Sequence, residues 1–131
     1  MEHNIRDALQ AYNERRNKGG IMNKPKIVCL CGSTRFSKAF QQAQLEETLA
    51  GKIVLTIGCN MRTDTDTFGD LLQPELDRIK LELDELHLRK IDLADEVFIL
   101  NVDGYIGEST TRELEYAKAN NKKIRFLESS G

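Results

Sequence analysis

The chain has 131 residues, which suits one domain that buries roughly two-thirds of the surface its unfolded form exposes. Hydrophobic residues make up 40% of it and charged residues 31%, which argues against a disordered or fibrous protein. The net charge of −2 gives no electrostatic case for nucleic-acid binding, and no apolar run approaches the ~18 residues of a membrane span. The charged amino terminus does not resemble a secretory signal, so a cytoplasmic protein without a membrane or nucleic-acid partner is expected.

The first predicted element is an amphipathic helix over residues 4–17, where apolar residues recur at helical spacing until Gly19 and Gly20. Met22 stands just before the first predicted strand. We therefore expect residues 1–21 to form a helical extension and residues 22–131 to form the main α/β domain. The helix could pack on its own domain or on a partner subunit, and the sequence favours neither.

Strand and helix patterns then alternate along the chain. Residues 26–31 (KIVCLC) form a continuous apolar run, typical of a parallel strand covered on both faces. Further strands are predicted over residues 53–57, 96–101 and 123–127, with helices between them. This order predicts a three-layer, doubly wound parallel sheet of four to five strands, Rossmann-like or flavodoxin-like, with an added N-terminal helix.

The first predicted strand contains Cys29 and Cys31, which should point to the same face and behave there as small buried hydrophobes. With Cys59 the chain has three cysteines. A Cys-x-Cys metal site would need partner ligands, and the only histidines are His3 and His87. Reduced structural thiols are therefore expected rather than a zinc site.

A polar loop over residues 58–70 follows the second strand, and a loop of this length is more often functional than idle. Its residues partly match a calcium-binding loop, with Asp64, Asp66, Gly69 and Glu75 at positions 1, 3, 6 and 12. The apolar Leu72 at position 9, and a strand in place of the entering helix, argue against calcium. No metal and no cofactor is therefore expected.

The helix after this loop carries an apolar stripe that should face a core or a partner. The stripe consists of Leu72, Leu76, Ile79, Leu83 and Leu86. His87 lies at the edge of the stripe, close to the expected helix end. A packed or half-exposed histidine is the ordinary interpretation, and a functional role is the alternative.

Two strand-to-helix turns carry most of the polar signal. In the first, Ser33, Thr34 and Arg35 follow Gly32, where backbone amides and a helix dipole favour an anion and the guanidinium could bind a phosphate. Ser33 or Thr34 could instead be a simple N-cap, worth ~1 kcal/mol, and both interpretations are about equally supported. The turn lacks the glycine-rich dinucleotide fingerprint and the P-loop lysine, so neither NAD nor ATP chemistry is indicated.

The second turn lies within residues 105–117 (YIGESTTRELEYA). Thr110 and Glu113 match a capping box, in which hydroxyl and carboxylate satisfy amides at the helix start. Alternatively, Glu113 lies in the first helical turn, is held ionised by the helix dipole and points into the cleft where open α/β folds bind ligands. A carboxylate beside a sugar can attack or shield an oxocarbenium-like carbon, and a second group must then protonate the leaving base.

Three segments, CGSTRF, LADEVFILN and GESTTRELEYA, occur in an order and spacing that resembles the nucleoside 2-deoxyribosyltransferase superfamily, which includes deoxynucleoside 5′-monophosphate N-glycosidases. The resemblance covers approximately residues 26–127. It implies that Glu113 is the catalytic glutamate, which forms a covalent deoxyribosyl intermediate in the transferases. It also implies a nucleoside or nucleotide substrate and a homo-oligomer, a dimer or larger, that completes its sites across subunits.

The resemblance places substrate contacts in both turns. The predicted substrate-binding residues are Gly32, Ser33, Thr34, Arg35, Asn101, Gly107, Ser109 and Thr110. This chain has Gly107 where the family carries Ser or Asp, and His87, eight residues before Asp95, where it carries an aspartate important for catalysis. A histidine with a pKa near neutrality can act as general acid to a departing base, so we predict His87 and Glu113 as the catalytic pair.

The sequence thus predicts an enzyme that cleaves or transfers at the N-glycosidic bond of a (deoxy)nucleoside or a nucleoside 5′-monophosphate. Two alternatives stay open. One is a non-catalytic nucleotide-binding or sensing module that uses the same cleft, and the other is a purely structural oligomerisation domain. The three differ in a measurable way, because the first turns substrate over, the second only binds it and the third does neither.

Overall fold

A computed structural model describes residues 5–17, 24–57 and 71–129 of the chain. The elements, in chain order, are α1 (Ile5–Asn17), β1 (Ile27–Cys31), α2 (Ser37–Leu49), β2 (Ile53–Leu55), α4 (Gln73–Leu93), β3 (Glu96–Ile99), the 3₁₀ helix η1 (Val102–Gly104), α5 (Glu108–Ala119) and β4 (Lys123–Phe126). The predicted alternation of strands and helices is therefore confirmed, with helix and strand boundaries close to those expected.

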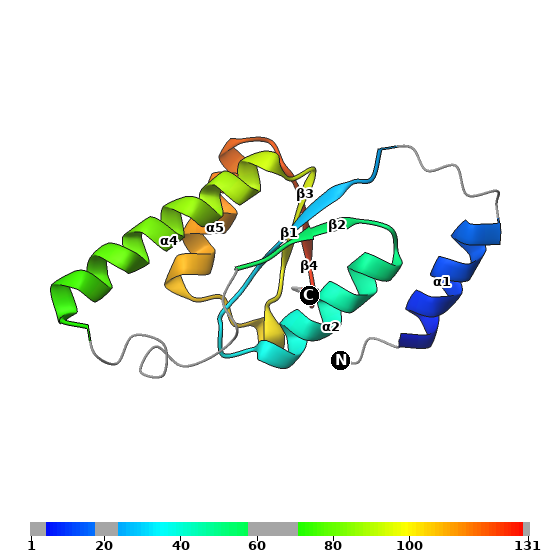
Figure 1. Ribbon diagram of the computed structural model, residues 1–131, viewed down its shortest axis with the longest axis horizontal. Helices are drawn as coiled ribbons and strands as arrows, with labels where there is room; N and C mark the ends of the chain where they lie inside the picture. Colours follow the sequence, from blue (N-terminus) through cyan, green and yellow to red (C-terminus); the bar gives the residue numbers. More distant parts are fainter. Residues whose placement is uncertain (1–4, 18–23, 58–70, 130–131) are drawn as a thin grey trace.

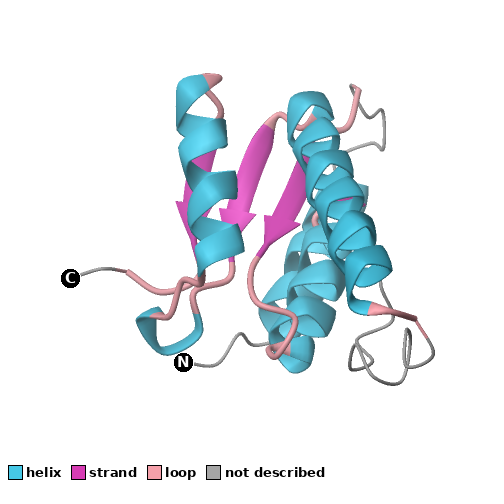
Figure 2. Cartoon of the chain, turned by 90° about the vertical axis from the view of Figure 1, so that its left-hand side faces the viewer, coloured by secondary structure: helices cyan, strands magenta, loops and turns pink. Residues whose placement is uncertain are grey.

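The strands of the described residues form one parallel sheet in the order β2-β1-β3-β4, and Figure 2 shows strands that run in the same direction. Helix α2 covers one face of the sheet, while α4 and α5 cover the other, which gives three layers (Figure 1). Helix α1 lies beside α2. The predicted three-layer, doubly wound parallel α/β fold with an N-terminal helix is confirmed.

Strand β1 is central, between β2 and β3, and is buried on both faces. Val28 and Leu30 pack in the core on the α2 side, whereas Cys29 and Cys31 pack in the core on the side of α4 and α5. This two-sided burial is the physical reason why the strand is apolar at every position. As expected, the two thiols lie on the same face, are free and are fully buried. The third, Cys59, lies outside the described residues.

Several element ends differ from the prediction, and β3 ends at Ile99 rather than at the predicted residue 101. Strand β2 ends at Leu55, before the predicted end, and α4 continues to Leu93, so that His87 lies well inside the helix rather than close to its end. Within the apolar stripe of α4, Leu72 is 70% exposed, Leu83 is 48% exposed and Leu86 is 52% exposed. The amino-terminal half of α4 extends beyond the sheet (Figure 1). Among the described residues, the core therefore does not cover that half of the stripe.

The polar loop over residues 58–70, which carries the calcium-like pattern, lies outside the described residues. Within the described parts of the chain, no helix is both long enough and apolar enough to cross a bilayer.

The connections create a switch point between β1 and β3. The chain leaves β1 toward β2 on one side and later reaches β3 on the other side of β1, and ligands of open α/β folds bind where the order reverses in this way. The backbone N–H of Leu100 donates to the carbonyl of Cys31 at 2.7 Å. A Cβ at Gly32 would lie 3.1 Å from Leu100 Cβ, so only glycine fits there without a shift. The two predicted turns, one after β1 and one after β3, therefore begin at the same tightly packed edge of the sheet.

A group of charged side chains lies near the amino ends of β2 and β3. We call Glu47, Lys52, Glu96 and Arg125 the ionic cluster. Lys52 Nζ lies 2.9 Å from Glu47 Oε1 and 2.7 Å from Glu96 Oε1, and Arg125 also pairs with both carboxylates. Burial would raise the pKa of Glu96, but the two cations outweigh burial and lower that pKa. Each carboxylate of the ionic cluster thus has two cationic partners.

Candidate functional site

At the switch point, Arg35 and Tyr105 join the first turn to the loop that follows β3. The Arg35 guanidinium donates to the Tyr105 hydroxyl oxygen at 3.4 Å, and its carbon lies 4.5 Å from the centroid of the tyrosine ring. Phe36 packs edge-on against the same ring, with centroids 5.9 Å apart. Arg35 and Tyr105 are both exposed, so the guanidinium can still reach an anion from solvent.

The first turn is shaped by Ser33. Its hydroxyl oxygen accepts from the backbone N–H of Arg35 at 3.3 Å, and its carbonyl accepts from the N–H of Phe36 at 3.1 Å. Helix α2 begins at Ser37, with Phe36 at the N-cap position and no side-chain cap bond. The interpretation of Ser33 or Thr34 as an N-cap is therefore wrong, because the helix starts beyond both residues.

The second turn also differs from the capping box that Thr110 and Glu113 suggested. Helix α5 begins at Glu108, with Gly107 at the N-cap and no side-chain cap bond. Thr110 is consequently the third residue of the helix, and Glu113 lies in its second turn. The capping-box alternative is wrong, and the expected position of Glu113 in the first turn is wrong as well. The Glu113 carboxylate is left free to point away from the helix end.

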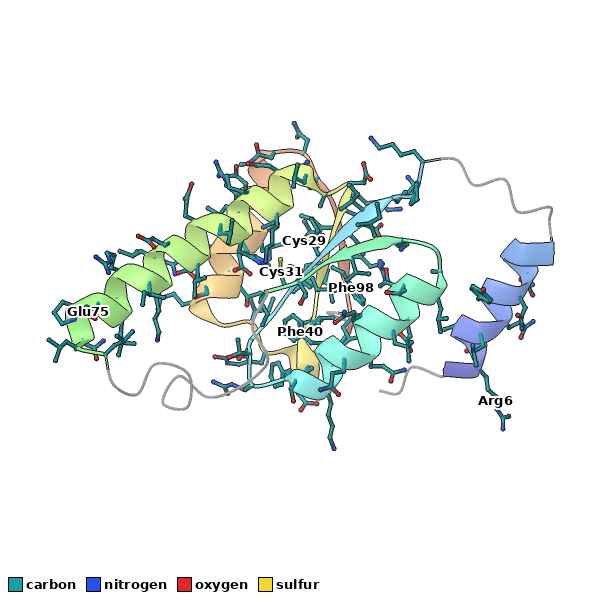
Figure 3. All side chains as sticks on the ribbon, in the orientation of Figure 1. Arg6, Cys29, Cys31, Phe40, Glu75 and Phe98 are labelled. Atoms are coloured by element: carbon teal, nitrogen blue, oxygen red, sulfur yellow. The ribbon has the colours of Figure 1, made fainter. Side chains whose placement is uncertain are left out.

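Glu113 instead joins a buried group of side chains between the sheet and helices α4 and α5. We call Cys29, Cys31, His87 and Glu113 the thiol–imidazole cluster. His87 Nε2 lies 3.3 Å from Cys31 Sγ, 3.7 Å from Cys29 Sγ and 3.9 Å from Glu113 Oε1. Figure 3 shows the two cysteines on the α4 and α5 side of β1, with Phe40 and Phe98 on the α2 side. The structure therefore brings together the two predicted catalytic residues and adds two thiols to them.

The thiol–imidazole cluster contains polar atoms without hydrogen-bond partners. Among the described residues, His87 Nδ1 and Glu113 Oε1 are buried and make no hydrogen bond. Such atoms are rare in folded proteins, because an unpaired buried polar group costs about 1–3 kcal/mol. The stability of the fold does not require these unpaired polar groups, which marks the cluster as a candidate functional site.

The pKa values of the cluster are set by its burial and internal contacts. Burial raises the pKa of Glu113 to about 7, and the neighbouring His87 offsets this only in part. Burial acts in the opposite direction on His87, but the hydrogen bond with Cys29 and the charge of Glu113 outweigh it and raise the pKa of His87. The hydrogen bond with Cys31 is the main cause that lowers the pKa of Cys29 to about 5, and it raises the pKa of Cys31. Burial thus acts against the expected ionisation of Glu113 by the helix dipole.

Asn101, predicted to contact substrate, is buried and hydrogen-bonded within the fold. Its side-chain amide donates to the carbonyl of Glu128 at 3.0 Å, and its side-chain oxygen accepts from the N–H of Glu128 at 2.9 Å. These two bonds fasten the end of β3 to the segment after β4.

The other predicted binding residues are split between surface and interior. Thr34 and Ser109 are exposed, Thr110 is buried and Gly107 provides the start of α5. In the described parts of the chain, Arg35 makes no hydrogen bond or ion pair with His87 or Glu113. The structure thus joins the predicted catalytic pair to the thiols, and the anion-binding candidate to Tyr105, at the same edge of the sheet.

Sequence reasoning missed two parts of the candidate site, namely Tyr105 and the pair of cysteines. It left Tyr105 without a role, although an aromatic residue at the head of a polar turn is a signal that could have been weighed. It also dismissed the cysteines because no ligand partner was evident, yet His87 lies against both. That contact depends on how α4 is rotated against β1, and a single sequence carries no direct signal of this rotation.

Comparisons of the chain with protein-family models, with curated proteins and with solved structures found no match.

Proposed function

We propose that this chain hydrolyses the N-glycosidic bond of a nucleoside or nucleoside 5′-monophosphate, or transfers its sugar, with Glu113 acting on the sugar and His87 on the base. The observation that carries the proposal is the buried pairing of these two side chains beside the switch point, with His87 Nε2 3.9 Å from Glu113 Oε1. The resemblance of GESTTRELEYA to a glycosyl-transferring superfamily supports the same role for Glu113.

The proposed reaction balances with these two groups. The bond from sugar C1′ to the base nitrogen breaks, its electron pair stays on the base, and the base takes a proton from His87. The Glu113 carboxylate bonds to C1′, or shields the oxocarbenium-like carbon. Water or an acceptor base then attacks C1′ and releases the sugar, and the proton of this incoming nucleophile returns to His87.

The exposures of the two side chains fit this division of roles. The side chain of Glu113 keeps 11% of its surface exposed, and that of His87 keeps 5%. The carboxylate is thus the more accessible of the two. Burial also strengthens every electrostatic interaction in the site, because the surroundings screen charge much less than water does.

Base release tests the proposal directly. The full chain would be incubated with a panel of ribonucleosides, deoxynucleosides and their 5′-monophosphates, and free base would be measured by liquid chromatography. We expect at least one substrate to release base, and Glu113→Gln to lower the rate on the order of 10³-fold or more, because the group that acts on C1′ is lost.

The matched control is Glu115→Gln, which changes an exposed carboxylate on the same helix and should leave the rate unchanged. Equal rates for Glu113→Gln and wild type would exclude Glu113 as the catalytic group. Binding by calorimetry without base release from any substrate would instead favour the nucleotide-binding module.

We propose that Arg35 binds the 5′-phosphate, since its guanidinium is exposed at the switch point and is held against Tyr105. Arg35→Gln should raise KM for a nucleoside 5′-monophosphate by about tenfold or more, and should leave KM for the matching nucleoside unchanged. Equal effects on both substrates would remove the phosphate from this part of the proposal.

We also propose a homo-oligomer, with the exposed apolar stripe of α4 as the surface that a second copy covers. The large exposed apolar residues of α4 are Leu81, Leu83, Leu86 and Leu93, and Leu72 precedes the helix. Leu86→Glu should lower the mass measured by light scattering after size exclusion to that of one chain, whereas Glu82→Gln on the same helix should not. A single-chain mass for wild type would contradict this part.

A further inference from the structure

The thiol–imidazole cluster supplies three donor atoms of the types that bind thiophilic metal ions. Cys29 Sγ, Cys31 Sγ and a nitrogen of His87 all lie within 4.8 Å of one another. Residues at i and i+2 of a strand point to the same face, which is why β1 presents both sulfurs toward α4. All three residues are buried, so a cation held there would be shielded from competing water.

The spacing matches tetrahedral coordination. Zinc lies about 2.3 Å from thiolate sulfur and about 2.0–2.1 Å from imidazole nitrogen, so neighbouring sulfur and nitrogen ligands of one tetrahedral ion are roughly 3.5 Å apart. The two distances in the cluster are 3.3 Å and 3.7 Å. A cation can therefore contact these donors with small movements of side chains only.

Glu113 is an independent indication of a ligand at the same place. Its Oε1 is buried, makes no hydrogen bond among the described residues and lies 3.9 Å from His87 Nε2. A carboxylate oxygen is an accepted fourth ligand for zinc, and coordination would satisfy an oxygen that the protein itself leaves unpaired.

We propose that Cys29, Cys31 and His87, with Glu113 as the fourth donor, form a binding site for a thiophilic divalent cation of the zinc class. Two sulfurs and one imidazole nitrogen select borderline and soft ions over magnesium and calcium, which prefer all-oxygen sites. Each cysteine binds as a thiolate, and a cysteine that is protonated in the free chain releases its thiol proton when the metal enters.

Metal binding has a consequence that rests on the proposed function. A bound cation occupies His87 Nε2 and Glu113 Oε1, the two atoms assigned to proton donation and to attack on the sugar. The metal-bound chain is therefore inactive as a glycosidase, and removal of the metal restores activity. The site would act as a metal-controlled switch rather than as a catalytic metal centre.

Cobalt titration of the reduced, metal-free full chain tests the site without any reference to activity. We expect one Co²⁺ per chain, a near-ultraviolet thiolate-to-cobalt charge-transfer band and the intense visible bands of tetrahedral cobalt, all removed by stoichiometric Zn²⁺. The Cys59→Ser chain, whose remaining thiols are Cys29 and Cys31, should give the same spectrum. Cys31→Val and His87→Gln should lose the tetrahedral spectrum and weaken binding at least 100-fold.

Thermal unfolding in the presence and absence of Zn²⁺ provides a second readout. At a hundredfold excess over Kd, Zn²⁺ should raise the midpoint of the wild-type chain by on the order of 10 °C, and should leave the midpoint of Cys29→Val unchanged. Absence of a thiolate band in wild type, or a band that survives both Cys31→Val and His87→Gln, would overturn the proposal. Base release is measured separately with chelator present, so failure of the metal site and failure of the glycosidase proposal are distinguishable.

Discussion

The ionic cluster and the thiol–imidazole cluster both contain buried carboxylates beside one sheet. They differ in whether the polar atoms of the cluster have hydrogen-bond partners. In the ionic cluster, each carboxylate meets both Lys52 and Arg125 at hydrogen-bonding distance. In the thiol–imidazole cluster, His87 Nδ1 and Glu113 Oε1 have no hydrogen-bond partner among the described residues. The first cluster is satisfied by the chain itself, and the second is not.

This difference separates a stabilising role from a functional one. A buried charge network is compatible with a stable fold when every member is paired, whereas unpaired buried groups lower stability. Evolution retains such unpaired groups mainly where a ligand or a reaction needs them. We therefore expect changes in the ionic cluster to affect the free energy of unfolding, and changes in the thiol–imidazole cluster to affect chemistry.

The largest effect on stability is expected from Arg125→Met. This change leaves Glu47 and Glu96 buried with Lys52 as their shared cation, and it removes the guanidinium that stacks 3.9 Å from the Phe98 ring centroid. We expect a loss of about 3 kcal/mol, at the low end for a broken buried pair because the Arg125 side chain is 35% exposed. Urea unfolding would measure it, with the exposed Lys123→Met on the same strand as a control that changes little. Equal losses for both would contradict the role of the cluster.

A smaller effect is expected from Gly32→Ala, at the edge beside Cys31. The new Cβ would lie 3.1 Å from Leu100 Cβ and 3.2 Å from the Leu100 carbonyl oxygen, in a core and backbone that cannot move freely. We expect a loss of about 1–2 kcal/mol in urea unfolding. Gly107→Ala is the control, since its Cβ would meet mainly the flexible end of Tyr105. A neutral Gly32→Ala would show that the contact between the ends of β1 and β3 is loose.

Glu113→Gln should change stability by less than about 1 kcal/mol, in the direction of a gain. Burial raises the folded pKa of Glu113 to about 7, so ionisation above its unfolded value costs folding free energy that the neutral amide avoids. The measurement is urea unfolding at pH 8 with a chelator present and Glu115→Gln as control. A large loss of stability would place Glu113 with the structural carboxylates of the ionic cluster.

The smallest expected effect is the pH dependence that Glu96 contributes to the free energy of unfolding. Its folded pKa lies below the ordinary value of 4.5, so its ionised form stabilises the fold above that pH, and this contribution is lost as the pH falls through the folded pKa. The difference in unfolding free energy between wild type and Glu96→Gln should narrow as the pH is lowered from 7 to 3. A constant difference across this range would show that the charge of Glu96 is not what stabilises the fold.

The fold could be predicted from the sequence because its signals are local. The apolar run before Gly32 and the alternation of strands with amphipathic helices fix a parallel α/β domain whatever the details of packing. The stripe of α4 was recognised as apolar, but an amphipathic pattern does not say what covers it. Among the described residues, Leu72 and Leu86 remain exposed.

The candidate site could be predicted only in part. Glu113 and His87 were identified as a pair, but the capping box at Thr110 was wrong because Gly107 starts α5 without any side-chain cap. The position of His87 against the thiols, and the use of Asn101 within the fold, depend on contacts between elements distant in sequence. Such contacts depend on how each helix is oriented against the sheet. The hydrophobic periodicity of the sequence does not determine that orientation.

The contact between Arg35 and Tyr105 has an entropic consequence for any anion that binds at the switch point. An arginine side chain loses up to about 2 kcal/mol of rotamer entropy when it is fixed. Part of that loss has already occurred in the free protein, because the ring of Tyr105 holds the guanidinium at 4.5 Å. A phosphate that binds there meets a pre-ordered partner, so more of the contact energy remains as affinity.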